Sequence, residues 1–115
     1  MDAVSTIFAM QRANGDWFAL EGREGLHVPV FSSNREAMQA RSFNVEMLVF
    51  HPVVVDEASL KGFAPAEGEP AARVWLVKQG STNMKRGVFL ESAELARLAH
   101  GAHGIDAEGL AHDRL

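Results

Sequence analysis

The run Met47–Val55, MLVFHPVVV, is the feature that most constrains the fold. Its side chains are almost continuously apolar and its second half is rich in valine, a composition typical of a strand that is covered on both faces. We therefore expect this run to form the central strand of a sheet. A two-layer domain would leave one face of such a strand bare, so the run also predicts that something else covers that face.

Turn signals divide the N-terminal part of the chain into further strands. Thr6–Ala13 is followed by Asn-Gly-Asp and then by WFALE, and an Asn-Gly pair supplies the positive φ angles that a tight hairpin turn requires. A second turn, EGREG, leads into a third strand, LHVPVF. Pro29 in that strand indicates a position at a sheet edge or an irregular register. The sequence thus predicts a meander at the start of the chain.

Three short helices are predicted from polar residues at their starts. Ser33 stands three residues before Glu36, the spacing of a capping box in which each side chain satisfies a backbone N–H of the other residue, and a helix over 34–43 follows. Asp56 can cap a second helix, EASLKGF. Ser92 can cap a third, AELARLAH, which carries an apolar stripe on one side.

These elements and the late strands RVWLVK and VFLE predict one α/β domain of the α+β type over residues 1–101. We expect a mixed, largely antiparallel sheet of five to six strands, with two to three short helices mainly on one face. Residues 102–115 show weak periodicity and contain two glycines. We expect them to form a mobile C-terminal tail.

Composition narrows the classes of function. The 115 residues are 47% apolar, which suits one domain with a real core, and the formal net charge of −4 offers no basic field for nucleic acid or an anionic membrane surface. The chain has no cysteine, which excludes disulfides, thiolate nucleophiles and cysteine-based zinc sites. We recognise neither a secretory signal nor a membrane span, and we expect a cytoplasmic protein.

The strand VPVFSS, Val28–Ser33, resembles the N-terminal domain of the SseB family, named for enhanced serine sensitivity, in which a strand of the form V-P-V-F-T-S precedes a helix. Ser32 stands where that pattern has threonine. The chain is also similar to several small bacterial α/β families without an assigned function. The resemblance implies a compact bacterial α/β domain, and it supplies no catalytic residue because none is established for the family.

No catalytic set is recognisable in the sequence. It contains no Gly-x-Ser-x-Gly nucleophile elbow, no Gly-x-Gly-x-x-Gly fingerprint and no Walker loop. His51 lies between Phe50 and Pro52, and we interpret it as a histidine at a strand kink that is hydrogen-bonded to nearby backbone. We read both tryptophans, Trp17 and Trp75, as core residues. The sequence therefore predicts a protein that is not an enzyme and that needs no cofactor.

The loop GSTNMKRG, Gly80–Gly87, is the best ligand site that the sequence offers. Backbone-flexible glycines flank small hydrogen-bonding side chains and two adjacent cations, a combination that can hold an anion. An ordinary polar hairpin loop is the alternative. The proposed anion-binding residues are Ser81, Thr82, Asn83, Lys85 and Arg86.

A metal site is a minor alternative at the end of the chain. His100 and His103 are three residues apart and could share a metal ion, with His112, Asp106 or Glu108 completing the site. Gly101 and Gly104 break the helix there, so the geometry is not prearranged, and a solvated segment is the competing interpretation.

These observations favour a small bacterial protein that acts as a non-enzymatic protein-interaction or regulatory module. The alternative is a small-ligand or anion-binding protein that uses the 80–87 loop. Because the two-sided apolar strand needs a cover, we expect a homodimer in which a second copy of the chain supplies it, with a further protein partner not identified by the sequence.

Overall fold

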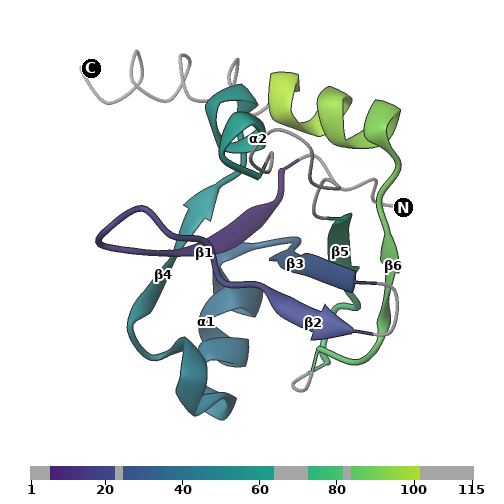
Figure 1. Ribbon diagram of the computed structural model, residues 1–115. Helices are drawn as coiled ribbons and strands as arrows, with labels where there is room; N and C mark the ends of the chain where they lie inside the picture. Colours follow the sequence, from purple (N-terminus) through teal and green to yellow (C-terminus); the bar gives the residue numbers. More distant parts are fainter. Residues whose placement is uncertain (1–5, 23–24, 64–72, 82–83, 102–115) are drawn as a thin grey trace, which may run out of the picture.

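The computed structural model describes residues 6–22, 25–63, 73–81 and 84–101. Six strands form one mixed sheet in the order β4-β1-β3-β5-β6, with β2 pairing β3 on the same side as β1 (Figure 1). The β3–β5 pair is parallel and the other pairs are antiparallel. The strands are β1 (Phe8–Arg12), β2 (Leu20–Gly22), β3 (Gly25–Phe31), β4 (Phe50–Val54), β5 (Arg73–Val77) and β6 (Gly87–Phe89). The α+β class and the mixed, mostly antiparallel sheet are as expected from the sequence.

The central strand is β3 and not the apolar run. It pairs with β5 on one side, and on the other it pairs with β2 through Leu26 and His27 and with β1 through Val30 and Phe31. Pro29 stands where the neighbour changes from β2 to β1, and neither strand is in register with it. A central strand tolerates a missing N–H at such a gap. The irregular register expected around Pro29 is therefore present, but the edge position is not.

The apolar run Met47–Val55 does not form a central strand, contrary to the sequence prediction. Only its second half is a strand, β4, and this strand lies at the edge of the sheet beside β1. The Val55 N–H donates to the Ile7 carbonyl at 2.9 Å, and in an antiparallel ladder the residues that bond to the partner alternate. Pro52 therefore turns its ring nitrogen toward the open edge, where a missing N–H costs no ladder bond.

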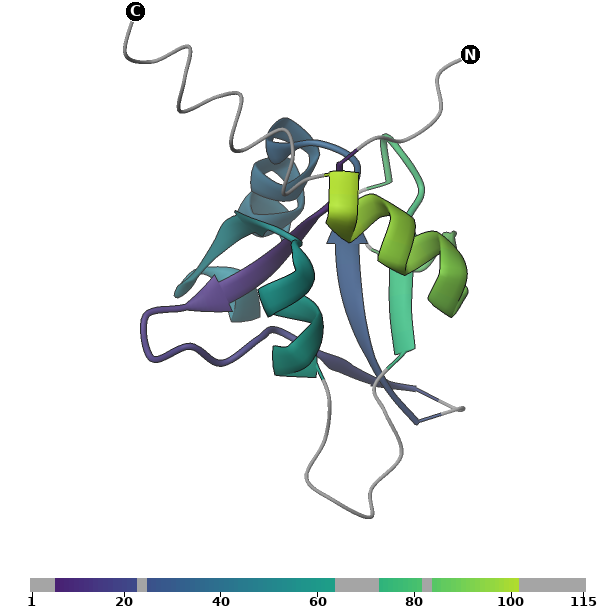
Figure 2. The same cartoon turned by 90° about the horizontal axis from the view of Figure 1, so that it is seen from above.

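Helices cover both faces of the sheet. Helix α1 (Asn34–Phe43) and the 3-10 helix η1 (Val45–Met47) lie on one face, and Figure 1 draws them below β1. Helix α2 (Glu57–Phe63) and a terminal helix over 92–101 lie on the other face, as Figure 2 shows from above. Two of the three α-helices thus share a face, and α1 with η1 covers the opposite one. Each face has its own buried cluster, one including Phe31, Ala37 and Met47 and the other including Val30, Phe63 and Leu98.

The helix starts differ in how they are capped. Ser33 accepts a hydrogen bond from the Glu36 amide at 3.1 Å, as predicted, but the Glu36 carboxylate accepts from the Gly80 amide at 2.9 Å. The expected capping box is therefore only half formed at α1. A reciprocal pair exists at α2, where the Ser59 amide donates to Asp56 at 2.9 Å and the Asp56 amide donates to the Ser59 hydroxyl at 3.3 Å.

The predicted cap of the terminal helix lies one residue off. The Leu95 amide donates to the Glu91 carbonyl at 2.9 Å, and the helix already includes Ser92. Glu91 therefore occupies the cap position that the sequence assigned to Ser92. Among the described residues, no helix has the length and apolar content needed to cross a membrane. Residues 102–115, which the sequence predicted to be a mobile tail, lie outside the described residues.

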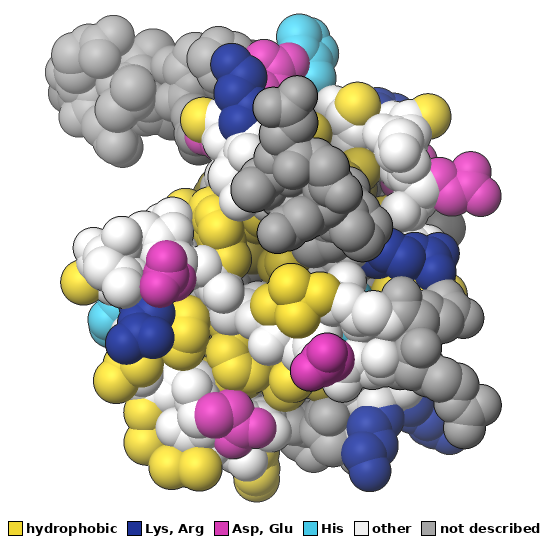
Figure 3. All heavy atoms as spheres, viewed as in Figure 1, with side chains coloured by type: hydrophobic (Ala, Val, Ile, Leu, Met, Phe, Trp, Pro, Cys, Tyr) yellow, Lys and Arg dark blue, Asp and Glu magenta, His cyan; other side chains and the backbone are white. Residues whose placement is uncertain are grey.

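Apolar side chains gather on the surface at one corner of the domain. Figure 3 shows them at the lower left, below β4. Four of the large exposed hydrophobic residues fall within seven positions at the end of α1, in η1 and in the turn before β4. We call them the 43–49 patch: Phe43, Val45, Leu48 and Val49. The dimer predicted from the sequence would cover a bare sheet face, whereas in the structure helices lie on both faces.

Candidate functional site

A groove of about 640 Å³ opens on the α1 face of the sheet. Helix α1 contacts β1, β3 and β4, and η1 follows it, so the residues of β2, β3, β5 and β6 farther along the sheet stay uncovered. These strands form the floor of the groove. Asn44 and Glu46, beside and within η1, line it, and so do Met84 and Lys85 from the segment before β6.

The floor of the groove is aromatic. His27 of β3, Trp75 of β5 and Phe89 of β6 point to the same face, and their ring centroids lie 4.7 Å apart for Trp75 and Phe89 and 5.9 Å apart for the two pairs with His27. Trp75 and Phe89 are direct cross-strand partners, which is why their rings meet edge to face. We call these three residues the aromatic floor.

Local backbone geometry fixes the position of Trp75. Its indole N–H donates to the Met84 carbonyl at 3.0 Å, and Met84 is buried with a left-handed φ of 62°. A side chain at Gly87 would collide with the Leu76 carbonyl, so this position in β6 needs a glycine to let the strands approach. The position of the Trp75 ring in the floor is therefore fixed by its surroundings.

Charges of both signs line the groove. The Arg73 guanidinium lies 3.7 Å from the centroid of the Phe89 ring, a cation–π contact, and Lys85 adds a second cation. Glu21 and Glu46 also line the groove. A ligand that fits must place any negative group near Arg73 and Lys85 and away from the two glutamates.

The described part of the predicted anion loop forms a hairpin turn. The Ser81 amide donates to the Lys78 carbonyl at 3.0 Å, and the Arg86 carbonyl accepts from the Lys78 amide at 2.7 Å, so both belong to a turn. Thr82 and Asn83 lie outside the described residues. The Glu36 carboxylate already accepts from the Gly80 amide, which places an internal anion at the start of the loop. Of the five predicted residues, Lys85 lines the groove.

The predicted metal ligands are only partly described. The His100 Nδ1 atom lies 3.3 Å from a carboxylate oxygen of Glu57, which joins the terminal helix to α2. His103 and His112 lie outside the described residues, so the site itself stays a prediction. Within the residues that the structure describes, no three His, Cys, Asp or Glu side chains cluster closely enough to hold a metal ion.

Sequence reasoning missed the aromatic floor. Both tryptophans are half-buried; Trp17 packs edge-on against Phe63 at 5.0 Å, whereas Trp75 lines the groove. The alternation in RVWLVK puts Arg73 and Trp75 on one side of a strand, and this was the available signal. His27 and Phe89 could be added only once the order of β3, β5 and β6 was known.

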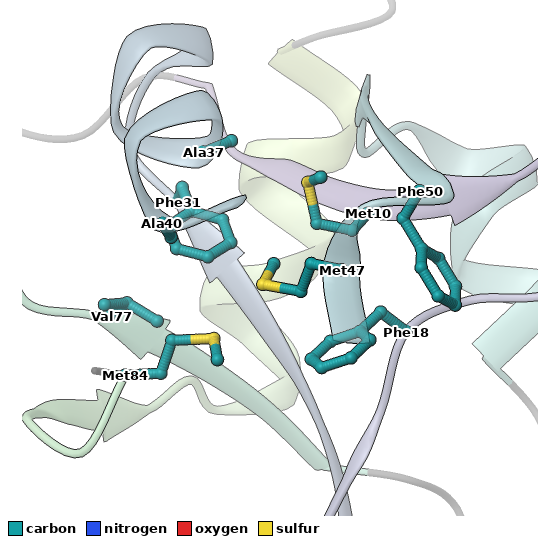
Figure 4. Close-up of a cluster of buried hydrophobic side chains, with 9 residues drawn as sticks. All are labelled: Met10, Phe18, Phe31, Ala37, Ala40, Met47, Phe50, Val77 and Met84. Carbon is teal, nitrogen blue, oxygen red and sulfur yellow. The ribbon is translucent and has the colours of Figure 1, made fainter. Parts of the chain in front are cut away.

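The first buried cluster supports the groove from below. Figure 4 shows Met47 in the middle of this cluster, among Met10, Phe18 and Phe31. Met84, which holds the Trp75 indole, belongs to the same cluster, and Trp75 packs against it. Changes in this cluster should therefore reach the groove through its floor.

Comparisons with protein-family models, curated proteins and solved structures find no match for this chain. The resemblance of Val28–Ser33 to the SseB family stays a prediction. The function is therefore inferred from the aromatic floor and the charges around it.

Proposed function

We propose that this chain is a non-enzymatic binding module that holds an aromatic, negatively charged group of a small ligand in the groove. The observation that carries the proposal is the open aromatic floor with two cations beside it. The groove volume of about 640 Å³ falls in the range of small-molecule sites. This proposal keeps the non-enzymatic binding role predicted from the sequence. It differs from the sequence-based alternative in the place of the ligand, which is the groove and not the 80–87 loop.

The chemistry of the lining selects the ligand class. A flat apolar group can stack on the edge-to-face rings of Trp75 and Phe89, and aromatic contacts of this kind contribute about 0.5–1.5 kcal/mol beyond area burial. A carboxylate or sulfonate on the same ligand is attracted by Arg73 and Lys85. The glutamates disfavour a second anionic group at the other end of the ligand.

The surroundings of His27 favour binding over catalysis. A histidine that acts as a general base is usually oriented by a second polar group that is hydrogen-bonded to its ring. The ring contacts of His27 are instead the two aromatic side chains of the floor. We further propose that the module is cytoplasmic, as its cysteine-free composition favours, and bacterial, as the resemblance implies.

A matched pair of dyes tests this function. Anilinonaphthalenesulfonate is an aromatic anion that becomes fluorescent in apolar sites, and phenylnaphthylamine is the same ring system without the charge. In a Trp17→Phe background, Trp75 is the sole tryptophan and reports directly on the groove by energy transfer to either dye. We expect both dyes to bind and to accept energy from Trp75, with the sulfonate binding more tightly.

Two variants separate the floor from the cations. Trp75→Leu should weaken both dyes about tenfold, the factor that corresponds to about 1.4 kcal/mol. Arg73→Gln combined with Lys85→Gln should weaken only the charged dye. If Trp75→Leu binds both dyes as tightly as the parent chain, the groove is not the binding site. If the double charge variant affects both dyes equally, the assignment of an anionic ligand is wrong.

A further inference from the structure

The 43–49 patch concentrates exposed apolar side chains in one short segment of the chain. The exposed fractions are 65% for Phe43, 76% for Val45, 48% for Leu48 and 60% for Val49. Single exposed hydrophobic residues are common, but four within seven positions form a local concentration. Val45, Leu48 and Val49 do not line the groove, so the proposed ligand leaves this surface uncovered.

The size of the patch can be compared with that of an interface. Together the four residues expose on the order of 400 Å² of largely apolar surface, within the range of about 300–600 Å² for the largest patch of a monomer, which is often functional. A standard protein interface buries about 800 Å² on each partner. The patch would therefore supply about half of one side of a stable interface.

The backbone of the segment that carries the patch is anchored to the rest of the domain. Met47, between Val45 and Leu48, is fully buried in the core. The Arg41 guanidinium of α1 donates a hydrogen bond to the Leu48 carbonyl, and the Asn44 side chain donates to the Ala40 carbonyl at 2.7 Å. Because the backbone is fixed on both sides, docking on the patch would cost little ordering entropy.

The neighbouring edge strand limits how a partner can dock. The backbone of β4 faces the open edge at Phe50, Pro52 and Val54, since the alternate residues bond to β1. Pro52 has no N–H to offer in the middle of that edge, which hinders the addition of another strand. Contact must therefore be made through the side chains of the patch rather than by extending the sheet.

We propose that the 43–49 patch is the surface through which two copies of this chain associate. A two-fold contact sets the patch against itself, so one apolar surface of this size supplies the centre of both sides of the interface. Glu46 is the only charged residue within the segment, and at physiological salt its repulsion from a second copy is screened beyond about 8 Å. This proposal is independent of the ligand in the groove.

The test compares a pair of exposed valines in the patch with one exposed valine outside it. The mass of the chain is measured by light scattering during size exclusion, over a concentration series that reaches high micromolar values. The wild-type chain should approach twice its 12.5 kDa monomer mass. Val45→Ser combined with Val49→Ser should weaken association about tenfold or more, as expected for the loss of buried methyl groups. Val88→Ser is the control, because Val88 is 58% exposed on β6.

Each other outcome overturns the proposal. A wild-type mass of 12.5 kDa at every concentration means that the patch does not pair with itself. Association that survives in the double variant, or that falls equally in Val88→Ser, places the interface elsewhere. Phenylnaphthylamine binding in the double variant should match that of the wild-type chain, which shows that the variant is folded and keeps failure of the dimer distinct from failure of the groove.

Discussion

The groove and the 43–49 patch are two apolar surfaces with different designs. The groove is concave and aromatic, its Trp75 ring is held by a hydrogen bond, and cations stand beside it. The patch lies on the outside of the same corner, is largely aliphatic and has no cation among its residues. A concave aromatic surface encloses a small flat molecule, whereas an outward apolar surface is covered only by something as large as another protein.

The two surfaces share one short segment of chain. Asn44 and Glu46 line the groove, Met47 enters the core, and the patch residues around them face outward. The three side chains of η1 point about 120° apart, as in any 3-10 turn. One turn therefore suffices to direct Val45 outward, Glu46 to the groove and Met47 into the core. The comparison therefore predicts which substitutions affect both surfaces and which affect only one.

Removing the shared support should have the largest effect. Met47→Ala deletes a fully buried side chain and should lower the free energy of unfolding by about 3 kcal/mol, within the usual range of 2–5 kcal/mol. Both dye binding and self-association should fall with it. Urea unfolding followed by Trp17 and Trp75 fluorescence measures the loss. A change below 1 kcal/mol would show that the segment is held by something other than this core contact.

The floor of the groove should contribute to stability, and the patch should not. Trp75→Ala removes a half-buried ring and its hydrogen bond to Met84, and we expect a loss of about 2 kcal/mol, below the 3–5 kcal/mol of a fully buried aromatic residue. At concentrations where the chain is monomeric, Val45→Ser should change stability by less than about 0.5 kcal/mol because its side chain is exposed. If both variants lose the same free energy of unfolding, the groove floor and the 43–49 patch do not differ in their contribution to stability.

The α2 cap lies on the opposite face and should affect neither surface. Asp56→Ala should cost about 1 kcal/mol of stability at neutral pH, the usual value for a lost N-cap. Hydrogen bonding from the Ser59 amide holds the pKa of Asp56 below its ordinary value. A lowered folded-state pKa stabilises the fold above the unfolded pKa of 3.8, and this contribution is lost as pH falls through the folded value.

The pH series for this pair is therefore informative. Wild type and Asp56→Ala should differ most near pH 7 and converge as the pH is lowered below about 4. Thermal unfolding at several pH values measures the difference. A gap that stays constant down to acid pH would show that the Asp56 charge is not what stabilises the start of α2.

The smallest effect is expected where α1 meets the 80–87 loop. Glu36→Gln replaces a charged acceptor of the Gly80 amide with a neutral one and should cost about 0.5 kcal/mol. Hydrogen exchange at the Gly80 amide should become faster, and dye affinity should fall slightly because Met84 and Lys85 belong to this loop and line the groove. Self-association should not change. Unaltered exchange at Gly80 would mean that the carboxylate does not anchor the loop.

Local features of this fold could be predicted from the sequence, but the order of the strands in the sheet and the contacts between distant segments could not. The caps at Ser33 and Asp56 follow from residues three positions apart, and each is present. The bond from Gly80 to Glu36 spans 44 residues and has no sequence signal. The run Met47–Val55 was placed at the centre of the sheet because apolar content reports burial and not neighbours, and Pro52 was the one residue that pointed to the edge.

The candidate site was predictable only in fragments for the same reason. Lys85 was selected because cations and glycines adjoin it in the sequence. The aromatic floor draws on three strands, and the parallel β3–β5 pair that brings His27 near Trp75 requires a crossover through α1, β4 and α2. The contact between His27 and Trp75 therefore cannot be predicted from residue spacing within one segment.

The most direct test of two surfaces with separate roles is an amide chemical-shift titration with anilinonaphthalenesulfonate at constant protein concentration. The dye should shift the amides of His27 and Phe89 and the indole signal of Trp75, while the amides of Val45 and Val49 stay in place. The result that would contradict the account is the reverse pattern, in which the dye shifts Val45 and Val49 and leaves the three aromatic residues of the groove unchanged.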